Sequence, residues 1–184
     1  MIETEHTPNP DTLKFLPGKT VSEVGPIEFL KNSKNISVPL ADKILSLQGI
    51  TMVFFGEDFI TVKKDKDLKW DDLKHNIISE INHYYSEGNS SVIKKKLRES
   101  STDSKKNDEN DIVNKINEVL DSKVRPAVAK DGGDITFKSF NNGVVTVELK
   151  GSCSGCPSST MTLKQGVQNL LCHYIPEVKS VEAN

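Results

Sequence analysis

Hydrophobic positions in the first half of the chain recur at two different spacings. Apolar residues at helical spacing predict one helix over 39–47 and a second from about residue 71 to 87. Short runs rich in apolar and β-branched residues predict strands over 12–16, 50–55 and 59–63. We therefore expect a first domain built from strands and two helices.

The second half shows the same two patterns in a different order. Asp111 is placed to cap the first helix, and Asn142-Gly143 is a strong hairpin signal between two strands. The order is helix, strand, strand, helix, strand. The expected elements are helices over 111–120 and from 157 to before 176, with strands over 135–139, 144–150 and 178–181.

A polar and charged segment separates the two halves. Residues 89–110 are dense in Ser, Lys, Asp, Glu and Asn and contain no aromatic residue. Such a segment buries too little apolar surface to order itself, so we expect a flexible linker. The sequence thus predicts an α+β protein of two small domains, 1–88 and 111–184, joined by the linker 89–110.

Composition narrows the classes of function. The formal net charge is −2 over 184 residues, so no basic field attracts nucleic acid. The longest apolar run, 50–55, is far too short to span a membrane. We expect neither nucleic acid nor membrane as a partner.

The start of the chain and its cysteines bear on the compartment. The first residues contain no secretory signal, and 3 cysteines do not form a disulfide framework. A reducing compartment follows. We expect the bacterial cytoplasm or, for a processed eukaryotic chain, the mitochondrial matrix.

The chemistry concentrates in the segment Cys153-Ser-Gly-Cys156-Pro157. It holds two of the three cysteines, two positions apart, between an expected strand and an expected helix. That spacing lets both sulfurs face one metal ion or cluster iron, or form a disulfide with each other. The N-terminus of a helix beginning at Pro157 favours thiolate over thiol, and thiolate is the reactive form.

Ligand counting leaves three chemistries open. A tetrahedral zinc ion or a 4Fe–4S cluster normally takes four protein ligands, and one chain offers only Cys153 and Cys156 at ligand spacing. Both metal readings therefore predict a dimer, whereas a dithiol–disulfide oxidoreductase needs none. Cys172 lies sixteen residues beyond Cys156 on the expected helix, roughly 24 Å away, and is interpreted as a half-buried structural thiol.

Asp131-Gly-Gly-Asp134 offers a second candidate site. Two carboxylates could bind a hard cation, but acids around glycines more often form a turn that opens a strand, which we favour. His173 is as remote from the two cysteines as Cys172, and His6, His75 and His83 are scattered and are interpreted as surface or helix-face residues.

Several spaced motifs resemble one family, the Nfu-type iron–sulfur scaffolds. The second half resembles the C-terminal domain of NifU, and the first half the N-terminal domain of longer Nfu proteins. The resemblance covers nearly the whole chain outside the linker. The motifs that carry it are Thr7-Pro-Asn-Pro-Asp-Thr-Leu-Lys-Phe15, the segments 46–62 and 70–73, Val124-Arg-Pro-Ala-Val-Ala-Lys-Asp-Gly-Gly-Asp134, the segment 151–166 and Pro176-Glu-Val178.

The resemblance implies a carrier rather than an enzyme. Members of the family hold a 4Fe–4S cluster bridged between two subunits, and in this chain the ligands would be Cys153 and Cys156. The implied partners are an upstream cluster-assembly machinery, apo iron–sulfur client proteins and, when the cluster is bound, a second copy of the chain. The implied function is to hold the cluster and transfer it to those clients.

Overall fold

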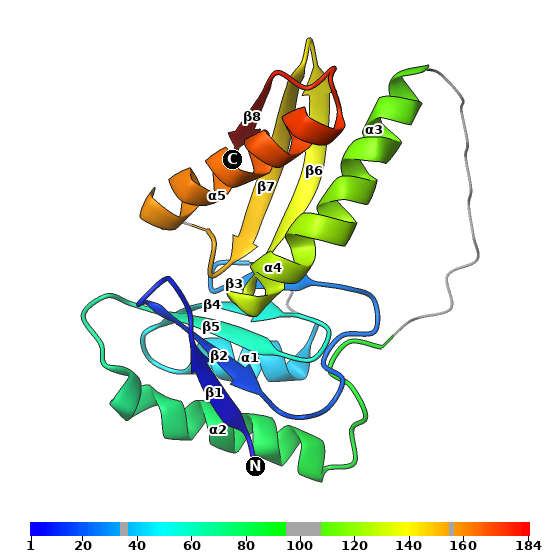
Figure 1. The fold of residues 1–184 in the computed structure, drawn as a ribbon. Coiled ribbons are helices and arrows are strands. Elements are labelled where there is room, and N and C mark those ends of the chain that lie inside the picture. The colour runs from blue at the N-terminus through cyan, green and yellow to red at the C-terminus, as the bar shows by residue number, and fades with distance from the viewer. Residues whose placement is uncertain (34–36, 95–107, 155–156) are drawn as a thin grey trace.

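The computed structural model describes residues 1–33, 37–94, 108–154 and 157–184 (Figure 1). It confirms an α+β protein with two separate sheets. None of the described helices has the length and apolarity needed to span a bilayer. The two domains are named here the first and the second domain, in chain order.

The first domain is a five-stranded antiparallel sheet with two helices. Its strand order is β1-β2-β5-β4-β3. The elements are β1 (Glu3–His6), β2 (Thr12–Leu16), β3 (Ile27–Leu30), α1 (Pro39–Ser46), β4 (Ile50–Phe55), β5 (Ile60–Lys64) and α2 (Trp70–Ser86). Both predicted helices and all three predicted strands are present, while the edge strands β1 and β3 were not expected.

The main core lies between the sheet and the two helices. Alternate strand residues face the helices, because successive side chains of a strand point to opposite faces. Phe15, Val53 and Ile60 are fully buried there together with Ile44 of α1 and Ile77 of α2. The second domain covers the opposite face of the same sheet (Figure 1).

The second domain packs its helices on a three-stranded sheet of order β6-β7-β8. Strands β6 and β7 are antiparallel, and β8 is parallel to β7. Its elements are α3 (Asp108–Val119), a π-helical segment η1 (Leu120–Val124), α4 (Arg125–Lys130), β6 (Gly133–Asn141), β7 (Val144–Gly151), α5 (Pro157–Tyr174) and β8 (Ser180–Ala183). The predicted order and the turn between β6 and β7 are confirmed.

Proline explains why the first helix of this domain is not a regular α-helix. Pro126 has no amide proton, and its ring would clash with the carbonyl of Ser122 in an unbroken α-helix. The segment η1 stands at that place and widens the backbone before α4 begins. Leu120, Val124 and Val128 nevertheless remain buried in one core.

The boundaries of the predicted linker differ from those of the structure. Val92 and Ile93 donate backbone hydrogen bonds to Val21 O at 2.8 and 3.0 Å, and Val92 packs in the first core. The first domain therefore extends past residue 88, because these apolar residues find a partner there. At the other end α3 begins at Asp108, so Asp111 is not its cap. Residues 95–107 of the predicted linker lie outside the described residues.

Candidate metal centre

Cys153 lies where β7 leads into α5, as predicted. Strand β7 ends at Gly151, whose φ of 69° turns the chain, and α5 begins at Pro157. We call residues 151–154 the cysteine loop. The side chain of Cys153 is 6 % exposed and packs at the edge of the second core, whereas Cys156 lies outside the described residues.

Ser152 attaches the cysteine loop to the turn before β6. Its backbone N–H donates to Gly132 O at 3.2 Å, and its hydroxyl donates to the carbonyl of Asp131. Ser152 itself is almost fully buried. The Asp131-Gly-Gly-Asp134 turn thus supports the loop that carries Cys153, through its backbone.

Further hydrogen bonds hold the backbone of Cys153 and Ser154. Ser154 donates to Gly151 O through both its backbone N–H, at 3.2 Å, and its hydroxyl, at 2.9 Å. The hydroxyl of Thr160, in the first turns of α5, donates to Cys153 O at 3.3 Å. The backbone around Cys153 is therefore held by both neighbouring elements.

A surface pocket of about 650 Å³ opens beside the cysteine. Its wall includes Cys153 and Thr160, together with Met161 and Lys164 from α5. Met161 is 76 % exposed, although it is a large apolar residue. Cys153 thus contributes to a concave surface with a cation beside it, a setting that suits an anionic ligand.

The carboxylate of Asp134 is engaged in an ion pair. Arg125 donates to it from Nε at 2.9 Å and from Nη2 at 3.2 Å, and Asp121 accepts from Nη1 of the same arginine at 3.0 Å. The hydrogen bond to Asp134 is the main cause that raises the pKa of Arg125. This bidentate pair supports the turn interpretation of the Asp131–Asp134 segment over a cation site.

Cys172 lies near the far end of α5, which runs without a break from Pro157 to Tyr174. It is half-buried and packs against the second core, as expected of a structural thiol. At the end of α5, Tyr174 is 49 % exposed, and the next residue, Ile175, is buried. Within the described ranges, no group of three or more Cys, His, Asp or Glu side chains could hold a metal ion.

Comparison with known proteins accounts for both domains. A family model described as NifU-like domain matches residues 116–182. A second one, described as scaffold protein Nfu/NifU N terminal, matches residues 2–88. The chain belongs to the Nfu-type NifU-like family.

Curated relatives of this Nfu-type chain match almost its whole length. NifU-like protein 4, mitochondrial, from Arabidopsis thaliana is 43% identical over 98% of the chain and 65% of its own length. The human NFU1 iron-sulfur cluster scaffold homolog, mitochondrial, is 42% identical over 98% of the chain and 70% of its own. The chain thus spans about two thirds of the length of these relatives.

Among solved structures, an NMR structure of a NifU-like protein from Saccharomyces cerevisiae is similar to part of the chain. It is 28% identical, with a TM-score of 0.47, and covers 52% of this chain and 86% of its own.

Proposed function

We propose that this protein carries a 4Fe–4S cluster bridged between two subunits and transfers it to apo iron–sulfur proteins. The ligands would be Cys153 and Cys156 of each subunit. Its partners would be the cluster-assembly machinery that supplies the cluster, the client proteins that receive it and a second copy of the chain. The observation that carries the proposal is the membership of a family whose named relatives are iron–sulfur cluster scaffolds.

The setting of Cys153 supports this chemistry. Thiolates are the usual ligands of iron–sulfur clusters. The N-terminus of α5 follows the cysteine loop, and the positive end of its helix dipole favours an anionic cluster. Lys164, which lines the pocket beside Cys153, adds a positive charge on the same side.

The number of ligands supports a bridged cluster. A 4Fe–4S cluster takes four thiolates, and Cys172 is held at the far end of an unbroken α5. Two chains supply the four ligands that one chain lacks. A cluster bound at a seam between subunits can also be released when they separate, which suits a carrier rather than an enzyme.

The relatives bear on the compartment as well. Of the two compartments expected from the sequence, the mitochondrial one is supported by the names of the plant and human relatives.

Anaerobic reconstitution with iron and sulfide tests the proposal. The expected product is a dimer with about four irons and four sulfides per two chains, and the apo protein should be monomeric or weakly associated. Sedimentation before and after strong chelation gives the mass, and metal and sulfide analysis gives the content. A monomer that carries a complete four-iron cluster would overturn the bridged arrangement.

The same preparation separates the two rival chemistries. A zinc-bridged dimer would contain zinc without labile sulfide. A dithiol–disulfide oxidoreductase would reduce insulin in rigorously metal-free form and lose that activity on Cys153→Ser. Either result would replace the cluster-carrier proposal.

A further inference from the structure

The first domain contacts the backbone on both sides of Cys153, at Ser152 O through Asn9 and at Ser154 O through Lys63. The contacts come from the sheet face opposite to α1 and α2, which we call the docking face, and from the loop and edge strand beside it. Three of them are short and directed at backbone groups of the cysteine loop or its supporting turn. Asn9 Nδ2 donates to Ser152 O at 3.2 Å, Thr61 Oγ1 donates to Gly132 O at 2.7 Å, and Glu28 Oε2 accepts from Gly151 N–H at 2.7 Å.

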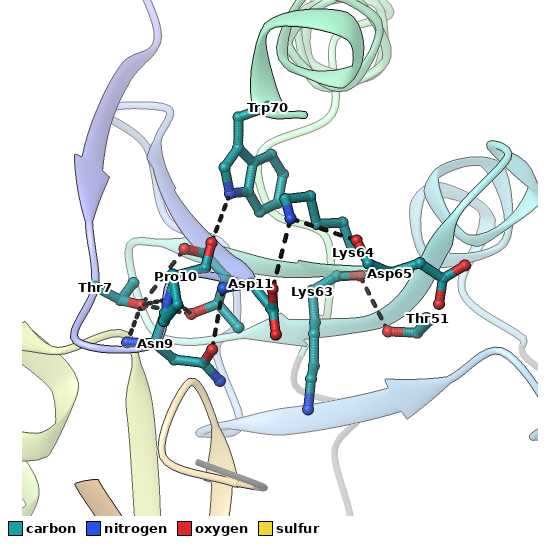
Figure 2. A network of polar contacts seen from close by, with 10 residues as sticks. Thr7, Asn9, Pro10, Asp11, Thr51, Lys63, Lys64, Asp65 and Trp70 are labelled. Atoms are coloured by element: carbon teal, nitrogen blue, oxygen red, sulfur yellow. Dashed lines mark hydrogen bonds and ion pairs between the residues drawn. The ribbon is translucent and has the colours of Figure 1, made fainter. Parts of the chain in front are cut away.

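A tight turn fixes the direction of the Asn9 amide. The hydroxyl of Thr7 accepts from Asn9 N–H at 3.1 Å, and Asn9 Oδ1 accepts from Asp11 N–H at 3.0 Å (Figure 2). Because Oδ1 faces Asp11, the amide NH₂ points the other way, to Ser152 O. The motif Thr7-Pro-Asn-Pro-Asp-Thr12 therefore builds a turn that presents one hydrogen-bond donor to the cysteine loop.

Apolar packing lies beside these hydrogen bonds, of which those of Asn9 and Thr61 are buried and that of Glu28 is partly buried. Phe54 of β4 is fully buried, and a Cβ at Gly151 would lie 3.2 Å from its ring. Met52 and Phe59 complete the buried part of the docking face, with Ala129 of the second domain packed against it. Buried hydrogen bonds such as those of Asn9 and Thr61 are costly to break, since their partners are left unsatisfied.

The hydrogen bonds from the first domain involve the same backbone groups that position Cys153. Gly132 O accepts from the Thr61 hydroxyl and also from Ser152 N–H, the residue before the cysteine. Gly151 N–H donates a further hydrogen bond to Glu28, and Ser152 O accepts one from Asn9. A backbone movement that brings Cys153 outward displaces these groups.

We propose that the first domain positions the cysteine loop and keeps the Cys153 thiol buried, and that loosening of this contact exposes the thiol. Asn9 and Glu28 are positioning residues that act through the backbone of Ser152 and Gly151. The proposal concerns the same cysteine as the proposed function, but it is independent of cluster binding, because it describes the metal-free chain.

The alkylation rate of Cys153 tests the proposal without iron or sulfide. The full chain carrying Cys156→Ser and Cys172→Ser leaves Cys153 as the one thiol, since the sequence has 3 cysteines. Iodoacetamide at fixed pH then reports how often the thiol becomes accessible. Asn9→Asp is nearly isosteric but sets a carboxylate oxygen against Ser152 O, and Glu28→Ala removes the acceptor for Gly151 N–H.

We expect both variants to react about three- to tenfold faster, because each removes a hydrogen bond that opposes local opening. Glu28→Gln keeps an acceptor oxygen and should stay within about twofold of the parent. Thr51→Val is the matched control, since Thr51 donates to Lys63 O at 3.3 Å within the first domain (Figure 2). It should leave the rate unchanged.

Three outcomes would overturn the proposal. Unchanged rates in Asn9→Asp and Glu28→Ala, with native circular dichroism, would show that the contact does not control the thiol. An equal acceleration in Thr51→Val would assign the effect to general loosening of the first domain. If Cys153 in Glu28→Gln reacts as fast as in Glu28→Ala, the acceleration would come from loss of the Glu28 charge and not from loss of the hydrogen bond.

Discussion

Gly133 lies directly beneath the thiol of Cys153. A Cβ at residue 133 would stand 2.7 Å from Cys153 Sγ and 2.7 Å from the carbonyl oxygen of Lys150. Neither neighbour can move freely, because Lys150 is paired with Asp134 in the ladder of β6 and β7 and Cys153 packs at the edge of the second core. The second glycine of Asp131-Gly-Gly-Asp134 is thus a steric requirement of the cysteine.

Gly133→Ala should therefore destabilise the second domain by about 1–3 kcal/mol, the usual cost of overpacking. Urea unfolding measures the loss. Gly166→Ala in α5 is the matched control, because a Cβ there meets no atom within 4 Å, and it should stabilise the protein by about 0.5–1 kcal/mol. A loss in Gly166→Ala equal to that in Gly133→Ala would contradict the steric explanation.

Strong local signals in the sequence predicted much of the fold. Asn142-Gly143 predicted the hairpin, and both residues adopt positive φ, 50° and 84°. The edge strands β1 and β3 gave no such signal. Strand β1 is mostly exposed and contains two glutamates, and charged residues are common on edge strands. Strand β1 forms because it pairs with β2, and the hydrophobic pattern of residues 3–6 does not predict that pairing.

The contact between the domains was also missed, although β4 contains a sign of it. Five of its six residues are buried, and only a strand covered on both faces has a nearly continuous apolar sequence. The sequence does not reveal which element provides the second cover. The place of Cys153 between a strand and a helix was predicted. The hydrogen bonds from Asn9, Thr61 and Glu28 were not, because they depend on how the two domains meet.

The Arg125–Asp134 pair should contribute more than the other ion pairs of the second domain. Asp134 is 5% exposed, and its bidentate geometry is lost in Asp134→Asn, so we expect a cost of about 1–3 kcal/mol. Glu148→Gln, which breaks the more exposed pairs with Lys138 and Lys150, should cost less than about 1 kcal/mol. Unfolding in low and high salt checks this, because only the exposed pairs should weaken with salt.

Tyr85 should make the first domain sensitive to alkaline pH. Burial, and to a smaller extent the nearby Tyr84, raises the pKa of Tyr85 from 10.0 to about 12. The unfolded chain therefore loses this proton first as pH rises, and the free energy of unfolding should fall between about pH 10 and 12. Tyr85→Phe should reduce that decline. The fluorescence of Trp70, the single tryptophan, reports unfolding of this domain.

Tyr85→Phe should also lower the free energy of unfolding at neutral pH. The Tyr85 hydroxyl donates to Thr20 O at 2.9 Å, so Tyr85→Phe should cost about 1 kcal/mol there. Tyr174→Phe, at an exposed position, is the control and should change neither quantity. An alkaline decline that is identical in Tyr85→Phe and in the parent would exclude Tyr85 as its source.

Cys153 and Cys156 should be required for cluster binding, and Cys172 should not be. Cys153→Ser and Cys156→Ser each remove one of the two proposed ligands, and because the cluster is shared, each substitution removes two ligands from the dimer. We expect both variants to lose most of their iron and sulfide after anaerobic reconstitution and to sediment as monomers. Cys172→Ser should keep both the cluster and the dimer, because Cys172 packs against the second core near the other end of α5. If Cys172→Ser loses the cluster as completely as the other two variants, the ligand assignment is wrong.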